Sequence, residues 1–291
     1  MNDEAGLFGP DSVTWRVHVE QIMWIAGLRA LYLQSLHPRV MRGTYQNSAL
    51  FDRARAWDRF LRTAEFVTVR TYGASGGVEA AAARVRDIHA RLRARDPDTG
   101  ATFRLDEPDA LLWVHCAEID SYVDVAHRSG ILDDAGADAY VAESRRAGAA
   151  VGVDPEAAPA SRADLDAYFQ KVRPRLRLTV EAARGLLNSF HPPLPTRLAP
   201  LRLAVPAANL LALSSLPAWA RRVFGAPNLP GTHTVVTLQL KALRAASAVV
   251  QPPLEVRIGR ARLFASEISA RRSSETSSAG RTRSEIPRTS P

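Results

Sequence analysis

The residues most able to do chemistry lie in the stretch 57–73, WDRFLRTAEFVTVRTYG. Arg59, Arg62, Thr63 and Phe66 recur at the spacing i, i+3, i+4 and i+7, so a helix would place them on one face. Two guanidinium groups and a hydroxyl turned toward an interior would require an anionic partner, such as a carboxylate-bearing cofactor or substrate. Two surface arginines in an Arg-rich protein explain the same spacing, and spacing alone favours that simpler interpretation. Apolar residues occupy much of the remaining surface of this helix: Phe60, Leu61, Ala64 and Val67.

A second candidate is His89, in the segment ARVRDIHARLRA. On a helix, His89 shares a face with Val85 and Leu92, and Ile88 is adjacent. A neutral imidazole on a partly apolar face can act as an axial ligand of iron. A surface histidine among arginines is the alternative, and it is favoured when only the spacing is considered.

A third constellation lies on the helix expected from Asp109 to about Ser129. His115 with Glu118, and Asp124 with His127, are i, i+3 pairs, a spacing that can bind metal. A di-iron bundle, however, needs such pairs on separate helices together with two further carboxylates. The sequence has no second Glu-x-x-His, so buried, hydrogen-bonded polar groups are the favoured interpretation.

Other familiar sites lack their motifs. The sequence contains no HExxH, CxxC, GxSxG, phosphate-binding loop or dinucleotide fingerprint. The single cysteine, Cys116, excludes an intramolecular disulfide and any all-cysteine metal site, and it fits a reducing compartment.

The elements that must position these residues are helices. The chain has 291 residues, of which 46% are hydrophobic, with long Ala- and Leu-rich segments and few alternating β-branched runs. This predicts an all-α protein with a single large helical domain over residues 12–264, preceded by an irregular arm at 1–11. From about Ala265 the chain is rich in Ser, Arg and Thr, which predicts a disordered basic tail over 265–291.

Capping and breaking residues set the expected helix limits. Asp11 or Ser12 is expected to cap the first helix, and His37-Pro38 to stop the second, with a turn at 43–48. Ser75-Gly76-Gly77 is expected to be a flexible joint. The main predicted helices are 25–36, 50–70, 78–95, 109–129, 133–150, 162–171, 176–189 and 232–247.

The net charge of +8 suggests an anionic partner, but acidic residues are interleaved with the arginines and no nucleic-acid module is present. Nucleic acid is therefore not expected. The acidic N-terminus lacks a signal-peptide pattern, which predicts a cytoplasmic location. Eighteen uncharged residues separate Arg202 from Arg221. Pro206 and Pro217 oppose a spanning helix, so a buried or membrane-surface hairpin, with peripheral membrane contact, is expected.

Several short motifs occur in a characteristic order over roughly residues 9–225. This order resembles the rubber-oxygenase (latex-clearing protein) catalytic-domain family, which includes the fungal ER-bound oxygenase of mycophenolic acid biosynthesis. The motifs are RALYLQSLHPRVMRG (29–43), Asn47-Ser48, Arg59-x-x-Arg62-Thr63, Gly73, His89 and Trp113-Val114-His115.

The resemblance implies an all-α, globin-related fold that binds b-type haem. His89 matches the proximal iron ligand, and Arg59 and Thr63 match an Arg-x-x-x-Thr motif beside the haem. Arg62 stands where rubber-cleaving members have a lysine that can cover the iron. Arginine stays protonated and cannot ligate iron, so the sixth position should be open or water-filled.

Rubber-cleaving members also carry a catalytic glutamate upstream of the motif. Between His37 and Arg59 this chain has no glutamate, and Asp52 and Asp58 are its only acids there. Polyisoprene is therefore not the expected substrate.

The prediction is a haem b-dependent oxygenase, or related oxidoreductase, acting with dioxygen on a small apolar or lipid-like substrate. His89 would hold the iron, and Arg59, Arg62 and Thr63 would line the opposite side or the propionates. One alternative is a non-catalytic haem- or lipid-binding protein of the same fold. Another is a non-haem metal-carboxylate oxygenase using His115, Glu118, Asp124 and His127. The sequence does not indicate the substrate or the redox partner.

Overall fold

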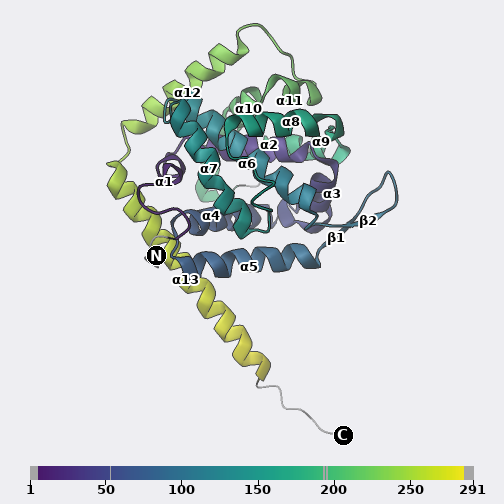
Figure 1. Cartoon of the computed structure of the whole chain (residues 1–291), viewed down its shortest axis with the longest axis vertical. Coiled ribbons are helices and arrows are strands. Elements are labelled where there is room, and N and C mark those ends of the chain that lie inside the picture. Colours follow the sequence, from purple (N-terminus) through teal and green to yellow (C-terminus); the bar gives the residue numbers. More distant parts are fainter. Residues whose placement is uncertain (1–5, 53, 193, 195, 285–291) are drawn as a thin grey trace.

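Within the residues that the structure describes, helices make up nearly all of the regular structure, as the composition predicted, and the exception is one short hairpin of two strands (Figure 1). The structure, a computed structural model, describes residues 6–284 except 53, 193 and 195. The helices are α1 (Val13–His18), α2 (Met23–Ser35), α3 (Pro38–Asn47), α4 (Ala56–Tyr72), α5 (Ser75–Arg91), α6 (Pro108–Arg128), α7 (Asp134–Ala150), α8 (Arg162–Val172), α9 (Val180–Ser189), α10 (Ala204–Ser215), α11 (Ala218–Val223), α12 (Thr232–Ala248) and α13 (Leu254–Ser284). Short 3-10 turns occupy Ala49–Phe51, Arg173–Arg175 and Thr196–Leu203. Strands β1 (Arg93–Arg95) and β2 (Thr102–Arg104) pair antiparallel, with Ala94 opposite Phe103.

The core is built around the packing of α2 against α6. Both helices present small and large apolar residues at helical spacing, and Leu33, Trp113 and Cys116 are fully buried between them. The Trp113 indole donates to the carbonyl of Gln34 at 3.0 Å. The buried guanidinium of Arg29 on α2 pairs with Asp120 on α6 at 2.6 Å. Apolar packing and a buried ion pair therefore set the register of this helix pair together.

Helices α4 and α5 form an antiparallel hairpin joined at Gly73. A Cβ added at Gly73 would lie 2.5 Å from the carbonyl oxygen of Val69, so a residue without a side chain is required there. The expected flexible joint at 75–77 is instead the first turn of α5. Gly77 allows this turn to approach α13, because a Cβ at that position would lie 2.9 Å from Ser269 Oγ.

Segment 38–47 is helical, although we expected a helix stop followed by a turn. His37 is extended, and its Nδ1 accepts from the amide of Val40 at 3.4 Å. Pro38 occupies the first helical position, where the missing N–H is not needed. The His37-Pro38 pair therefore ends α2 and also begins α3. Ser12, one of the two predicted caps of α1, accepts from the amide of Trp15 at 3.2 Å.

The expected disordered tail is wrong over the part that the structure describes, since α13 continues through Ser284. Ala265 and Ile268 are buried, and Ala265 packs with Trp15 and Tyr72. An apolar spacing that starts before the predicted tail and continues into it anchors the first half of α13: Ile258, Ala261, Ala265 and Ile268. Residues 285–291 lie outside the described chain.

The uncharged stretch after Arg202 forms α10 and α11, which are separated by Leu216-Pro217. Asn209 and Ala212 are buried, whereas Leu210 is 59% exposed. Among the described residues, no helix has the length and apolar character needed to cross a bilayer.

Candidate functional site at the open end of a helix hairpin

The α4–α5 hairpin brings together residues that are distant in sequence. Arg59 lies about as far before the Gly73 turn as His89 lies after it, so an antiparallel hairpin places them near one another. The positive charge of Arg59 is accordingly one of the causes that lower the pKa of His89. Arg59 Nη1 also donates to Thr63 Oγ1, one helical turn along α4, at 2.5 Å. Three of the four predicted site residues therefore gather at the open end of the hairpin.

His89 is half-buried, and its Nδ1 is buried without a hydrogen-bond partner among the described residues. Burial lowers the pKa of His89, the charge of Arg59 lowers it further, and Asp106 opposes the shift. The imidazole is therefore neutral at neutral pH. A neutral imidazole with an unused nitrogen can accept a hydrogen bond or bind a metal ion.

The two arginines of the motif differ in exposure. Arg59 is half-buried, and its pKa is lowered by burial and by the neighbouring charge of Arg62. Arg62 and Thr63 are exposed, so the polar stripe does not face the interior. No carboxylate within the described chain forms an ion pair with either arginine. The hairpin end therefore carries two adjacent positive charges that an anionic ligand could neutralise.

The same end of the hairpin is loosely packed. The buried residues of α4 are confined to its last turn, at 69–72, and those of α5 are Val78 and Ala82. Residues 56–68 of α4 and 83–91 of α5 are half-buried or exposed. Separating these segments costs less free energy than separating the packed end of the hairpin, because opening them exposes little buried apolar surface to water.

An aromatic row lines this end of the hairpin. The ring centroids of Trp24 on α2 and Phe60 on α4 are 5.8 Å apart, and those of Trp57 and Phe60 are 5.7 Å apart. The Trp24 side chain is 57% exposed, and the Trp57 indole nitrogen is buried without a partner in the described chain. Trp57 and Phe60 lie beside the motif in the sequence. Trp24 is on a different helix, and nothing in the sequence indicates that it packs against Phe60.

His115 and Glu118 belong to a different, buried polar cluster. Arg70 of α4 binds both oxygens of Glu118, at 2.5 and 3.3 Å. A cavity of about 10 Å³, room for one water molecule, is lined by these three residues with His18 and Tyr140. Burial lowers the pKa of His115 to about 4, with Glu118 opposing the shift and Arg70 adding to it. On the facing helix α7, only a glycine fits: a Cβ at Gly148 would lie 2.8 Å from the His115 ring.

The other two residues of that constellation are held elsewhere. Asp124 pairs with Arg128 at 3.2 Å, and His127 lies 3.0 Å from Asp134. Across the described ranges, no group of three His, Cys, Asp or Glu side chains is arranged to hold a metal ion. The four residues therefore do not converge on a common metal site.

A comparison with protein families gives one match. The family model described as ER-bound oxygenase mpaB/B'/Rubber oxygenase, catalytic domain, matches residues 15–250. No curated protein and no solved structure matches the chain. The matched region begins in α1, ends between α12 and α13, and contains the whole hairpin site.

Proposed function

Because the chain belongs to the family of ER-bound oxygenase and rubber oxygenase catalytic domains, we propose that it is a haem-dependent oxygenase or related oxidoreductase. Its substrate would be a small apolar or lipid-like molecule. The observation that supports this proposal most directly is the neutral imidazole of His89. Its Nδ1 is buried and unpartnered, and the charge of Arg59, which donates a hydrogen bond to Thr63, acts on it from α4.

The donor set at the hairpin fits a haem b group. His89 would hold the iron through its imidazole, since its lowered pKa leaves a nitrogen free of a proton at neutral pH. Arg59 and Arg62 would bind propionates, because both are cationic and neither has a carboxylate partner in the described structure. Haem, when bound, would supply the activation of dioxygen, which no protein side chain provides.

The remaining work falls to side chains of α2 and α4. Arg59 directs Nη1 at Thr63 Oγ1, so guanidinium and hydroxyl are held in a fixed relation as hydrogen-bond donors for an oxygen-bearing ligand. Trp24, Trp57 and Phe60 would exclude water and receive an apolar substrate. The loosely packed ends of α4 and α5 could separate to admit the group between the two helices.

The test is a titration of purified protein with hemin, followed by absorption in the Soret region. The wild type should give a saturable Soret band, and His89→Ala should lose it. His115→Ala is the matched control, because His115 belongs to the Arg70–Glu118 cluster, and it should retain the band. Equal bands in wild type and His89→Ala, or a wild type that does not bind hemin, would contradict the proposal.

A haem-binding protein without turnover is the second candidate. It is favoured by the segment between His37 and Arg59, which lacks the glutamate that the rubber-cleaving members carry there. Asp52, one of its two acids, is paired with Arg55 at 2.7 Å. Oxygen uptake separates the candidates: an oxygenase consumes dioxygen when supplied with a reductant and an apolar substrate, and a binding protein does not. Iron without a Soret band, lost in His115→Ala, would instead support the non-haem alternative.

A further inference from the structure

Helix α12 is apolar on two opposite faces. Its inward face buries Val236 and Leu240 against the core. A helix at the surface of a soluble domain normally turns charged and polar residues outward. The outward stripe of α12 is instead apolar at helical spacing, and its exposed members are Val235, Leu238, Ala242, Ala245 and Val249. Such a stripe indicates a surface that is covered by a partner.

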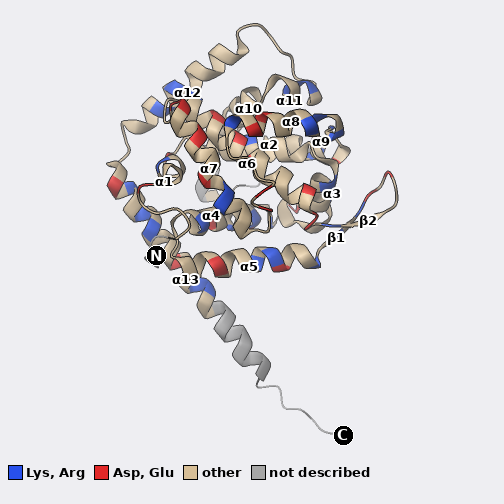
Figure 2. Ribbon diagram, in the orientation of Figure 1, with Lys and Arg blue, Asp and Glu red and all other residues tan. Residues whose placement is uncertain are grey.

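The segment that carries α12 contains no carboxylate. Between Glu181 and Glu255 the sequence has no Asp or Glu, although the rest of the chain is rich in both. Figure 2 shows that the next acidic position after α12 lies at the start of α13. Seven basic residues occupy the acid-free segment: Arg184, Arg197, Arg202, Arg221, Arg222, Lys241 and Arg244. Its partner should therefore combine an apolar phase with negative charge.

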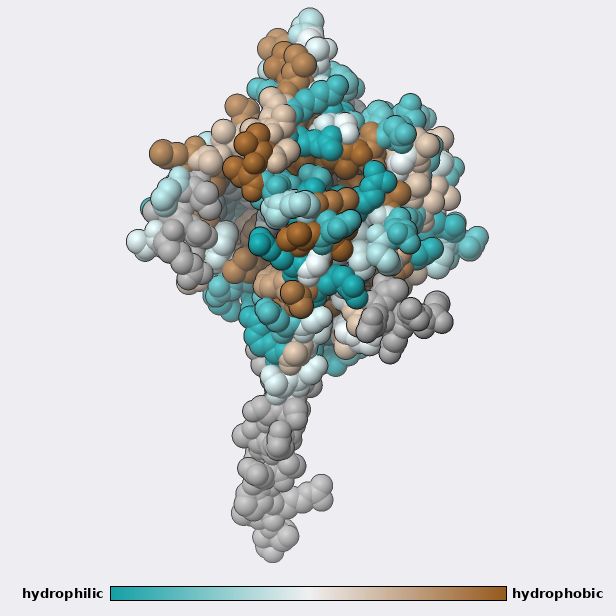
Figure 3. Space-filling view, turned by 90° about the vertical axis from the view of Figure 1, so that its left-hand side faces the viewer, coloured by the Kyte–Doolittle hydropathy of each residue, from teal (hydrophilic) through white to brown (hydrophobic). Residues whose placement is uncertain are grey.

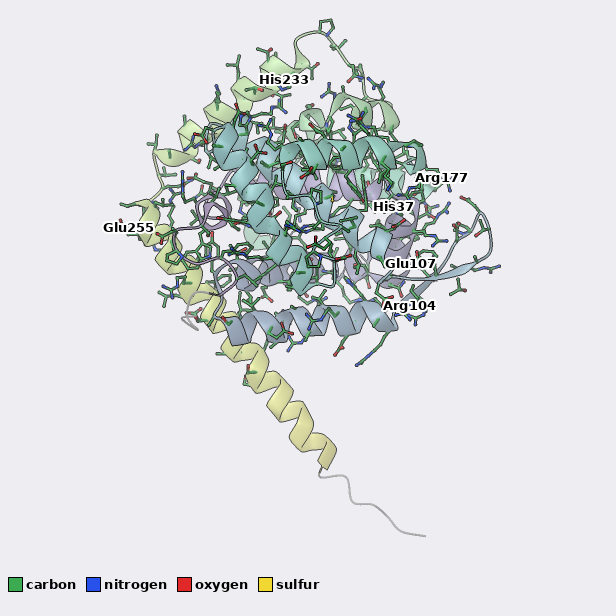
Figure 4. The ribbon with its side chains drawn as sticks, in the orientation of Figure 1. His37, Arg104, Glu107, Arg177, His233 and Glu255 are labelled. Atoms are coloured by element: carbon green, nitrogen blue, oxygen red, sulfur yellow. The ribbon has the colours of Figure 1, made fainter. Side chains whose placement is uncertain are left out.

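The joint between α12 and α13 extends this surface. Val249 and Val250 are 86% and 76% exposed. Figure 4 places His233 near the start of α12 and Glu255 at the start of α13, which mark the two ends of the surface. Figure 3 shows hydrophobic side chains exposed over the upper part of this side of the molecule. Helix α12 and the joint form the outer edge of the fold in Figure 1.

A cleft of about 350 Å³ lies beside the joint and offers unused hydrogen-bond donors. Arg244, Gln251 and Arg257 line it, together with Glu20, which pairs with Arg257 at 3.1 Å. Gln251 Nε2 and Arg257 Nε are buried, and neither has a partner in the part of the chain that is described. With two arginines and one glutamate, the cleft keeps a net positive charge and suits a phosphate group.

We propose that α12 and the α12–α13 joint form a docking surface for an anionic phospholipid bilayer. The apolar stripe and the two valines would enter the interfacial region, and Lys241 would contact acidic headgroups. The cleft would receive a headgroup phosphate. A second copy of the chain would not neutralise this surface, because both copies would present basic, acid-free faces to each other. The proposal does not depend on haem binding or on turnover.

The test is co-sedimentation of the full chain with vesicles. We expect binding to vesicles of equal parts phosphatidylcholine and phosphatidylserine, much weaker binding to phosphatidylcholine alone, and weakening by salt. Val249→Glu and Leu238→Glu should each reduce binding at least about tenfold, since a charge must leave water as the stripe enters the interface. Val180→Glu is the matched control, with a side chain that is 66% exposed on α9, and it should bind like the wild type.

Unchanged thermal melting of the three variants would show that they fold. The proposal is overturned if the wild type does not bind acidic vesicles, or if Val249→Glu and Leu238→Glu bind them as strongly as the wild type does. Equal loss in Val180→Glu would overturn it as well, because binding would then reflect charge in general. Light scattering tests whether a second copy of the chain occupies the surface instead. If the wild type is a dimer that does not bind vesicles, and Val249→Glu makes it a monomer, the surface is a dimer interface and the lipid proposal is wrong.

Discussion

At the scale of single residues, the environment of His89 sets the protonation state of its imidazole. Burial and the charge of Arg59 both lower its pKa, and Asp106 compensates only in part. The imidazole is therefore held neutral by its surroundings, and iron would not have to displace a proton from it at neutral pH. Arg59 thus has a role toward His89 in addition to its hydrogen bond with Thr63.

Removing the charge of Arg59 should raise the pKa of His89. The physical reason is that a nearby positive charge disfavours the imidazolium, and Arg59→Gln takes that charge away. The measurement is an NMR titration of the His89 ring protons in protein without haem. Arg62→Gln is the control, since Arg62 is not among the causes that shift the pKa of His89. It should leave the titration midpoint of His89 unchanged. An identical midpoint in Arg59→Gln and wild type would refute the coupling.

At the scale of elements, α4 has one anchored end and one loose end. Its last turn is buried and is tied to α6 through the ion pair between Arg70 and Glu118, whose side chains are only 7% and 19% exposed. The other end, which bears Arg59 and Thr63, is half-buried or exposed. This division allows a ligand to rearrange the site while the α4–α6 contact keeps the hairpin on the core.

Glu118→Gln should destabilise the protein strongly. It leaves the Arg70 guanidinium buried without its counter-charge, a change that costs about 3 to 5 kcal/mol in the free energy of unfolding. The matched control is Glu79→Gln, which breaks the exposed pair with Arg86 and should cost about 0 to 1 kcal/mol. Urea unfolding measures both. If the two variants lose similar amounts, the ion pair does not anchor α4.

At the scale of the whole molecule, α13 packs against the N-terminal helices although it lies after the end of the matched family region. Ala265 packs with Trp15 of α1 and Tyr72 of α4, so this helix covers residues from two separate N-terminal helices. With α12 it also makes the joint that we assign to a lipid surface. The global stability of this assembly depends on buried polar groups, among them His115, which is 4% exposed.

Acid should destabilise the folded protein in part through His115. Burial lowers its pKa to about 4 in the folded state, whereas the unfolded chain takes up the proton near 6.5. Between these values the unfolded state binds more protons, so stability falls as the pH falls, by about 1.4 kcal/mol per pH unit for this group. His115→Gln should flatten the dependence of unfolding free energy on pH in this window. His233→Gln, at an exposed position on α12, should not.

Local sequence signals accounted for most of the helices. Ser12, Gly73 and the apolar run of α6 act through contacts with near neighbours, so their spacing is sufficient to predict structure. The same approach missed the helix in the predicted tail, because Ala265 in a Ser- and Arg-rich segment has a packing role only once Trp15 and Tyr72 are beside it. It also missed the helix after Pro38, since proline stops one helix and starts another with equal ease.

By itself, the sequence determined the all-α class and the identity of the motif residues, because helical periodicity and residue chemistry are local properties. Only the tertiary structure decided which partners meet. It places Arg59 near His89 across the hairpin, joins Arg70 to Glu118 from 48 positions away, and turns a second apolar face of α12 outward. These outcomes depend on how helices pack against each other, and packing is set by the whole core.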